Sequence, residues 1–565
     1  MRKSKFSQTK SNAFKISKSY FMNTKHIPSD GWRGLVENWK SDLPSGFIVA
    51  LLALPLSLGI AAASDFPPVF GLLTAMIGGI VVSFLAGSVL TIKGPAAGLI
   101  VIVAGAVGEF ALGAPAGSST ADATAYGWHL ALGAVVVAGI IQVIFGLLKF
   151  GSFSDFFPLS AVHGMLAAIG IIIMSKQLHI LVGMNPVTEA GKPMVEPLEL
   201  IGELRHTFAN FFAHKEVVII GLVSLVIVFV WPMLKIQALK KVPAALVVLV
   251  VAIPLGKMLH LQNATGFAPL LEFKKGLFDI LGVNVSFAGI SMVGTFVKYV
   301  IMFALVGSLE ALLTVKATDM LDPFRRKSNA NKDLIAVGVG NIIAGILGGL
   351  PMISEVARSS SNVSNGAKTR WANFFHGLVI LIFLIFAVSF SDMIPKAALA
   401  ALLIGVGIKL AHPREFIHMF QIGKEQLLVF IVTIVFTLVE DLLIGIAAGI
   451  VTEMIVLLVS GASLSSLFKA QAEVAFIDDK YEVRVSRAAV FTNFMAIKNK
   501  LESIPAESHI TIFFENSRVI DHSAMEQLHL FKSNYEREGG EVIIEGISDH
   551  KTFSKHQLAG RKKKK

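Results

Sequence analysis

Residues Gly348–Ser360, GGLPMISEVARSS, interrupt an otherwise apolar part of the chain. Two glycines before Pro351 allow the backbone to leave helical geometry, and a new helix can begin after the proline. A helix start presents backbone N–H groups and about half a positive charge, so it can bind an anion. Arg358 adds a permanent cation, and Ser354 and Ser359 add hydroxyl groups. The sequence therefore predicts an anion-binding segment here.

Glu355 is an unexpected residue in such a segment, because a carboxylate repels an anion. Three interpretations are open: it pairs with Arg358, it binds a cation, or it faces away from the cavity. An Arg358–Glu355 ion pair at the membrane edge is the structural alternative to an anion site.

Apolar segments recur on both sides of this stretch, from Pro44 to Leu467. The 565 residues are 54% hydrophobic and 16% charged, whereas soluble domains have about 25% charged residues. This composition excludes a purely soluble enzyme and a disordered protein, and a sequence without cysteine excludes disulfides and thiolate sites. Since a spanning helix needs about 20 apolar residues, we predict fourteen spans. Their boundaries are 44–63, 69–87, 95–111, 128–148, 160–182, 216–235, 242–259, 292–315, 334–350, 352–364, 374–391, 394–411, 425–439 and 442–467.

A second interruption, Lys93–Gly98 (KGPAAG), opens the third predicted span, while Gly348–Ser360 opens the tenth. These are the same places in two halves of seven spans, which is typical of an inverted-repeat transporter with its site at mid-membrane. The simpler alternative is that Pro and Gly are frequent in membrane helices. Two facing helix N-termini would form a pocket suited to a small oxyanion. We expect the opposing half-helix to begin at Pro95, Ala96, Ala97 and Gly98.

Glu310 lies in the eighth predicted span, within Gly307–Thr314 (GSLEALLT). Charged groups inside apolar spans are costly and mark functional sites. Glu310 and Thr314 are four residues apart, so they share a helix face. A carboxylate beside a hydroxyl can bind Na⁺, with Ser354 as a further ligand, or can carry a proton when buried. An interhelical hydrogen bond is the structural alternative to this coupling-ion role.

Positive charge is concentrated at the two ends of the chain. The formal net charge is +11, of which residues 1–43 contribute +6 and Arg561–Lys565 contribute +5. This distribution indicates cytoplasmic ends beside anionic lipid and no nucleic-acid partner. We therefore expect a basic cytoplasmic segment over 1–43, a transport domain over 44–467 in the cell (inner) membrane, and no cleaved signal peptide.

After Leu467 the hydropathy changes to alternating strands and helices, which predicts a small cytoplasmic α/β domain over 478–565. We expect strands at 481–486, 509–514 and 541–547, helices at 488–504 and 525–538, and one short helix after Ile547. The sequence of this domain has no Gly-rich phosphate loop and no cluster of metal ligands. We expect a regulatory or structural role and no cofactor.

These motifs resemble the sulfate permease (SulP) family of anion transporters, which carry a C-terminal STAS domain. Val519–Ala524 (VIDHSA) resembles the STAS loop before its helix, and the domain is short after Ile547. The membrane motifs keep the family's order over residues 42–467. They are DLPSG and ALPLSL within 42–58, GPAAG at 94–98, SLEALLT at 308–314, GGLP at 348–351, Arg358, and NGAKTR at 365–370.

The resemblance implies an all-α polytopic membrane protein of fourteen spans in 7+7 inverted repeats with broken third and tenth helices. It also implies a homodimer and an elevator-like movement of a core against a gate. Glu310 then matches the acidic coupling residue, Thr314 a sodium-coordinating hydroxyl of bicarbonate carriers, and Arg358 the cation of the substrate site. Glu355 departs from the pattern, since many members have small uncharged residues there.

We expect symport of a small inorganic oxyanion, sulfate or bicarbonate, with H⁺ or Na⁺ as the coupling cation. A dicarboxylate carrier or an uncoupled anion channel of the same fold is one alternative. A membrane-anchored sensor, whose STAS domain signals to a cytoplasmic partner, is an alternative of a different class. Complete membrane motifs and a short STAS end favour transport. We do not expect an enzyme, because the predicted spans carry no convincing nucleophile–base pair.

Overall fold

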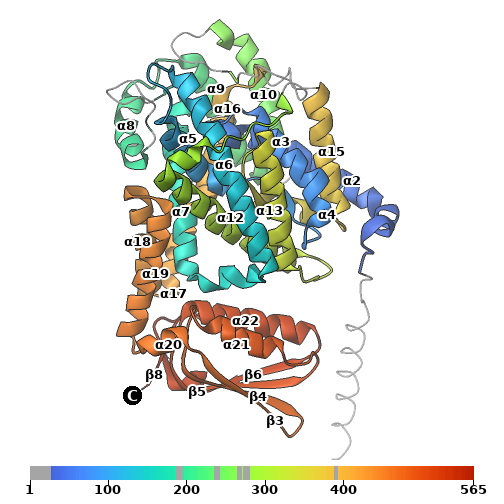
Figure 1. Cartoon of the computed structure of the whole chain (residues 1–565), viewed down its shortest axis with the longest axis vertical. Helices are drawn as coiled ribbons and strands as arrows, with labels where there is room; N and C mark the ends of the chain where they lie inside the picture. The colour runs from blue at the N-terminus through green and yellow to red at the C-terminus, as the bar shows by residue number, and fades with distance from the viewer. Residues whose placement is uncertain are drawn as a thin grey trace, which may run out of the picture.

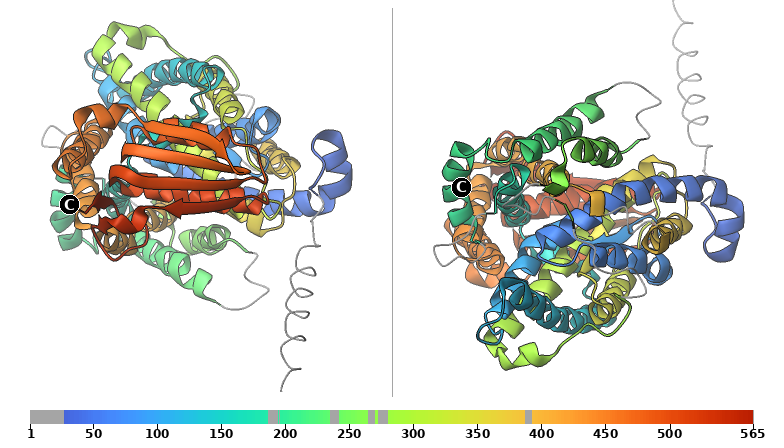
Figure 2. Two further views of the ribbon diagram at one scale, coloured as in Figure 1. Left: turned by 90° about the horizontal axis from the view of Figure 1, so that it is seen from below. Right: turned by 90° about the horizontal axis from the view of Figure 1, so that it is seen from above.

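The computed structural model describes residues 27–185, 194, 196–234, 242–263, 270–271, 280–386 and 392–564. A large helical region extends to Phe468, and a smaller region of strands and helices lies below it (Figure 1). Seen from below, the sheet of the smaller region spreads across the helical region (Figure 2, left). The prediction of a mostly helical chain with a small C-terminal α/β region is confirmed.

The helical region contains long and short apolar helices. By length and composition, eight helical stretches among the described residues can cross a membrane, and four shorter apolar helices accompany them. Twelve of the fourteen predicted segments overlap these twelve stretches. The other two, 352–364 and 425–439, overlap the helices Val356–Ser364 and Lys424–Val439, which are not among them, and the number of membrane crossings stays a prediction. The helices are α2 Gly31–Ala63, α3 Val69–Ile77, α4 Ser83–Leu85, α5 Ile100–Ala111, α6 Thr120–Leu147, α7 Leu159–Leu181, α8 Pro197–Ala209, α9 Lys215–Val230, α10 Ala244–Met258, α12 Val293–Leu321, α13 Ala330–Leu347, α14 Val356–Ser364, α15 Trp371–Phe386, α16 Lys396–Leu410, α17 Pro413–Ile422, α18 Lys424–Val439, α19 Leu442–Val459 and α20 Leu464–Phe468.

The first helix begins earlier than the apolar run predicts. We expected it to begin at Pro44, but α2 begins at Gly31, whose N–H donates to Asp30 Oδ1 at 2.8 Å. Pro44 lies inside α2, as proline does in membrane helices when neighbouring groups satisfy the freed backbone. The expected basic segment 1–43 therefore ends in helix, and residues 1–26 lie outside the described residues.

The helices form two packed groups. In the first, α5, α6, α12 and α13 pack on one another around two short strands, β1 Ile92–Pro95 and β2 Met352–Glu355, with α3 and α15 beside them. In the second group, α7 and α16 pack together with α9, α18 and α19. α2 packs against α15 of the first group and α16 of the second. Both strands are thus enclosed by the first group.

Two motifs far apart in the sequence meet at α2. The buried Asp42 carboxylate accepts the backbone N–H groups of Lys368 at 2.7 Å and Thr369 at 3.2 Å. Arg370 Nη2 donates to Asp30 Oδ2 at 2.7 Å, just before the helix. Asp42, in the DLPSG motif of the first predicted span, therefore holds the loop between α14 and α15 in place.

The C-terminal sheet is built around one long strand. β5 lies between β4 and β6, parallel to both, and its last residues pair antiparallel with β8, which pairs with β7. Alternation along β5 buries Ile510, Ile512 and Phe514 in the core with α21 and α22. Those two helices cover the face of the sheet toward the helical region (Figure 1). The elements are β3 Gln471–Ile477, β4 Lys480–Ala489, α21 Phe494–Glu502, β5 His509–Ile520, α22 His522–Arg537, β6 Glu541–Glu545, β7 His550–Thr552 and β8 Arg561–Lys563.

The end of the chain differs from its prediction. A short helix was expected after Ile547, but β7 and β8 form a hairpin there, and the sheet region already begins at Gln471. β8 consists of basic residues, whose composition suggests a solvated tail. Pairing of Lys562 with Val519 and of Arg561 with Ile520 fixes it to β5 instead.

Candidate functional site

The two interrupted segments form an antiparallel ribbon. β1 pairs with β2 so that Ile92 lies opposite Glu355 and Pro95 lies opposite Met352. All eight residues of the two strands are buried. Irregular backbone at membrane depth needs partners for its N–H and C=O groups, and the ribbon provides them.

A helix follows each strand of the ribbon. The turn η2 (Ala97–Leu99) and α5 follow β1, and α14 follows β2 with Glu355 as its N-cap residue. The backbone N–H of Ala97 points to the Glu355 carboxylate. Pro95, Ala96 and Gly98 are buried and Ala97 is half-buried. The expected opening of the first half-helix therefore faces Glu355.

Glu310 lies on α12 against the same opening. Its side chain is buried, and a Cβ at Gly98 would stand 2.0 Å from its Oε1 atom, so the carboxylate holds this position only because residue 98 has no side chain. Among the described residues, Oε1 has no hydrogen-bond partner. Thr314, one turn further along α12, is also buried. The structure thus brings the predicted coupling residue to the start of the first half-helix.

Glu355 and Arg358 form an ion pair, which is one of the three interpretations that the sequence left open. Arg358 Nε lies 3.0 Å from Glu355 Oε2, and the side chains are 0% and 9% exposed. A Cβ at Gly94 would stand 2.5 Å from Arg358 Nη1, so the guanidinium lies against β1. Within the described chain, its three nitrogens make no hydrogen bond of good geometry. A buried guanidinium with free donors can bind an anion through two parallel hydrogen bonds.

The two predicted serine ligands have other partners. Successive residues of a strand point to opposite faces, so Ser354 and Glu355 point in opposite directions. Ser354 Oγ donates to Asp333 Oδ2 at 3.1 Å on α13. Ser359 Oγ donates to the Glu355 carbonyl at 2.5 Å and accepts the Ile92 N–H at 2.9 Å. Ser354 therefore faces away from Glu310 and is not a ligand for an ion beside it. Ser359 joins α14 to β1.

A buried charge pair behind the ribbon was missed by the sequence reasoning. Lys93 Nζ lies 2.9 Å from Asp333 Oδ1, with both side chains at most 1% exposed. Asp333 also accepts the Ser88 N–H at 3.1 Å. The signal was present, since Lys93 is a charge inside an apolar segment. Its partner, 240 residues away, could not be found from spacing.

A further buried carboxylate, Glu453 on α19, lies in the second helix group. Gln426 Nε2 lies 3.3 Å from each of its oxygens, and Ser160 Oγ donates to Gln426 Oε1 at 2.5 Å. Asp521, at the start of α22, lies close enough to repel this carboxylate. Burial raises the pKa of Asp521 to about 7, although Asp521 accepts the Ala524 N–H. Glu453 was also missed, although its charge inside an apolar span was a signal.

Asp155 joins the C-terminal region to the helices. It lies in the turn η3 (Phe150–Phe156), where it pairs with Lys316 of α12 and with Lys498 of α21 at 2.6 Å. Gln527 of α22 donates to it at 2.9 Å. Burial opposes ionisation, but the two lysines outweigh it and hold the pKa of Asp155 below its usual value. The C-terminal region therefore contacts the same helix that carries Glu310.

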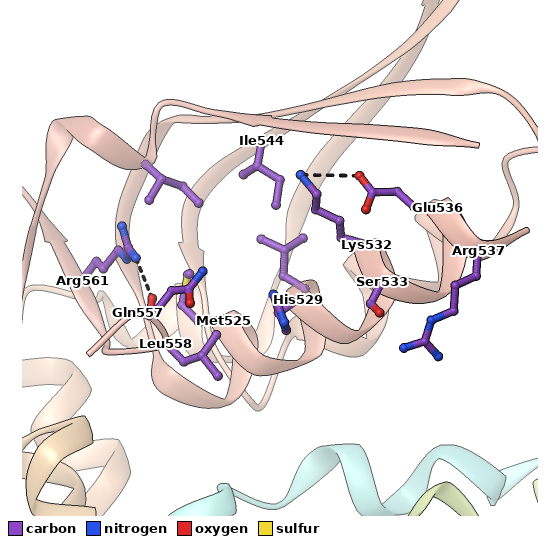
Figure 3. Close-up of a pocket in the computed structure, with 12 residues that line it drawn as sticks. Met525, His529, Lys532, Ser533, Glu536, Arg537, Ile544, Gln557, Leu558 and Arg561 are labelled. Atoms are coloured by element: carbon purple, nitrogen blue, oxygen red, sulfur yellow. Dashed lines mark hydrogen bonds and ion pairs between the residues drawn. The ribbon is translucent and has the colours of Figure 1, made fainter. Parts of the chain in front are cut away.

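A separate pocket of about 590 Å³ lies within the C-terminal region, between α22, β6 and the segment before β8 (Figure 3). Lys532 lies 3.6 Å from Glu536, and Arg561 Nη2 donates to the Gln557 carbonyl at 2.8 Å. Arg537 points away from the space between them (Figure 3). None of its lining residues belongs to the ribbon or to α12.

Comparison with known proteins identifies the family and the fold of the chain. Residues 39–433 match the model of the sulfate permease family. The chain is 26% identical over 544 residues to YvdB of Bacillus subtilis (strain 168), which bears a provisional sulfate-transporter name, and the alignment covers 93% of this chain and 95% of YvdB. The transmembrane domain of a cyanobacterial bicarbonate transporter, BicA, has a TM-score of 0.60 at 23% identity, over 73% of this chain and 97% of that one. Murine Solute Carrier 26 family member A9, in its inward-facing state, has a TM-score of 0.63 at 17% identity, over 94% and 92% of the two chains. These two structures share the fold.

Proposed function

The chain belongs to the sulfate permease family, and we propose that it is a secondary active transporter that moves a small inorganic oxyanion, sulfate or bicarbonate, together with protons. The relatives are transporters and not enzymes. The observation that carries the proposal is the β1–β2 ribbon, which holds two helix starts and the buried Arg358 in one place.

Arg358 and the helix starts suit an oxyanion. Charge-assisted hydrogen bonds from a guanidinium match the paired oxygens of sulfate or bicarbonate. Backbone N–H groups at Ala97 and at the start of α14 add partial positive charge. In this proposal the anion replaces Glu355 as the partner of Arg358, and Pro95, Ala96, Gly98 and Ser359 form the surrounding backbone wall.

Charge balance supports a proton as the coupling ion. Ionised Glu310 and Glu355 together with Arg358 sum to −1 in a buried site, and an anion makes this sum more negative. Uncompensated buried charge is expensive, so uptake of a proton by Glu310 favours anion binding. A Na⁺ ion at Glu310 and Thr314 is the alternative, but Na⁺ needs several oxygen ligands, and Ser354 is bonded to Asp333 instead.

Membrane topology and movement are further parts of the proposal. Fourteen spans in two inverted halves of seven place both termini in the cytoplasm, with a basic segment over 1–43 and a transport domain over 44–467 in the inner membrane. The first helix group is the moving core, and the second is the gate of an elevator-like transporter. Residues 478–565 act as a STAS domain with a regulatory or assembly role, and two copies form a homodimer.

Uptake by purified protein in liposomes tests the proposal. Labelled sulfate and labelled bicarbonate are offered separately, with a pH gradient or a Na⁺ gradient imposed one at a time. We expect one of the two anions to accumulate under the pH gradient and neither under the Na⁺ gradient. Glu109→Gln is the matched control, because Glu109 lies at the far end of α5, half-exposed and bonded to Lys298. Accumulation driven by Na⁺ alone would contradict proton coupling, and no accumulation of either anion would contradict the proposed substrates.

A further inference from the structure

A strongly basic groove lies where the chain's last hairpin meets the helical region. It is a cavity of about 1100 Å³ between the end of α17, the start of α18 and the β7–β8 hairpin. The C-terminus lies below α17 and α18 in Figure 1. We call this cavity the basic groove; Glu425 is its one acidic lining residue. Its cations are Lys424, Lys551, Lys555, Lys562, Lys563 and Lys564.

The lysines of the basic groove are not neutralised. Within the described residues, none of the six forms an ion pair with a carboxylate. Lys563 and Lys564 donate to the backbone carbonyls of Glu515 at 2.6 Å and Ser548 at 2.9 Å, which leaves their charges in place. Such a cluster repels itself unless an anion lies among its members.

Strand pairing brings two of these charges directly together. Lys551 on β7 lies opposite Lys562 on β8 in the antiparallel register. Like charges in directly opposite positions destabilise a sheet. The hairpin is nevertheless anchored, because Ser554 Oγ donates to the carbonyls of Gln421 at 2.8 Å and Ile422 at 2.6 Å at the end of α17. The fold therefore holds like charges in place beside the membrane helices.

An apolar stripe begins at the basic groove and continues along α18. Its members are exposed large hydrophobic residues, spaced three apart on α17 and three or four apart on α18, so those on each helix share one face of that helix. Phe420 of the stripe and Lys424 both line the groove. The stripe consists of Ile417, Phe420, Leu428, Ile431 and Val435, which are 56%, 54%, 50%, 41% and 48% exposed. A ligand of the groove therefore has an apolar surface directly next to its anionic end.

We propose that the basic groove binds the headgroup of an anionic phospholipid, whose acyl chains lie along the apolar stripe. Lysine clusters at the cytoplasmic side of a membrane helix attract anionic lipid. A free phosphate has the charge for the groove but no part that covers the stripe, so the two surfaces together favour a lipid. This inference goes beyond the proposed transport and holds whichever anion is carried.

Native mass spectrometry of the full-length protein tests the proposal. The protein in detergent is titrated with phosphatidylglycerol and, separately, with phosphatidylcholine of the same acyl chains. The test variant carries Lys551→Ala, Lys555→Ala and Lys562→Ala. The control carries Lys480→Ala, Arg518→Ala and Arg537→Ala, three exposed cations of the C-terminal region that do not line the groove.

We expect tight binding of phosphatidylglycerol only. Each lysine beside an anionic surface contributes about fivefold in affinity, so the test variant should bind about 100-fold more weakly, while the control variant binds as the wild type does. A third variant with arginine at the same three positions should retain binding, because it keeps the charge.

Four results on lipid binding would overturn the proposal. They are equal binding of the two lipids, an equal loss in the control variant, loss of binding in the arginine variant, and displacement of the lipid by an equal concentration of glycerol phosphate. The last result would identify a site for soluble phosphates. A test variant that loses self-association and keeps its lipid would assign the surface to a second copy of the chain.

Discussion

Gly98→Ala isolates the role of Glu310 without touching Glu310 itself. The new Cβ would stand 2.0 Å from Glu310 Oε1, whereas ordinary contacts begin at 3.4 Å, so the carboxylate must retreat by about 1.4 Å. The carboxylate is the far end of a flexible side chain, and it can move without disturbing backbone. A side chain forced off its rotamer costs about 1 kcal/mol, and alanine in a helical turn regains up to about 1 kcal/mol relative to glycine. The free energy of unfolding should therefore change by less than about 1 kcal/mol.

Transport should respond far more strongly than stability. A displacement of about 1 Å at a reacting group can cost about 100-fold in rate, so uptake driven by a pH gradient should fall by about that factor. The assay is labelled-anion uptake into liposomes, with thermal unfolding measured on the same preparations. Gly108→Ala is the control, because Gly108 lies on α5, which directly follows the turn η2 that holds Gly98, and its Cβ would meet no atom within 4 Å.

Two results would refute this reasoning. Wild-type uptake by Gly98→Ala, with an unchanged pH dependence, would show that the position of the Glu310 carboxylate does not matter. A large loss of thermal stability would show that Gly98 serves packing rather than coupling.

Arg358→Ala should weaken anion binding by about 10- to 100-fold, because a charge-assisted hydrogen bond is worth about 1.5–3 kcal/mol. Calorimetric titration measures the anion affinity, and an unchanged affinity in folded protein would contradict the role of Arg358. Glu310→Gln mimics the protonated acid, so it should abolish accumulation under a pH gradient yet keep anion exchange in liposomes without a gradient; accumulation equal to that of the wild type would make Glu310 structural. Deleting residues 478–565 should leave part of the uptake, since the ribbon lies outside that region, and complete loss from folded, inserted protein would refute this. Burial raises the pKa of Asp521 to about 7, above the unfolded value of about 3.9, so the stability of the start of α22 should fall as pH rises from about 4 to 7 and stay level above. Hydrogen exchange of residues 522–528 checks this, and Asp521→Asn should remove the dependence.

The sequence predicts the outlines of this fold because apolar length and turn residues are local signals. Glu310 was found as a charge inside an apolar span, and the structure brings it to Gly98. The sequence also predicts the break at Pro351, but it predicts a helix directly after the proline and not a strand. Residues 352–355 form a strand, so Ser354 faces α13, whereas a helix starting at Pro351 would have placed it on the face of Arg358.

Long-range pairing explains what the sequence could not supply. The partner of Lys93 is Asp333, which lies just before an apolar segment and therefore looks like part of a polar loop. Similarly, β8 is stable only through its pairing with β5 and β7. Neither contact produces a repeating pattern in the sequence, since each joins segments that are far apart in the chain.

The backbone ladder between β1 and β2 has a consequence for the energetics of transport. Separating the strands inside the membrane would leave backbone N–H and C=O groups without partners, at several kcal/mol for each group, so Arg358 and both helix starts keep one mutual geometry in every conformation. A ligand can shift an equilibrium only by its difference in affinity between the two states. An anion that meets the same contacts from either side of the membrane has no such difference, so its binding does not bias the site toward either side. In the proton coupling proposed above, that bias comes from a group outside the ladder, Glu310 on the separate helix α12, which gains and loses its proton while the ladder stays closed.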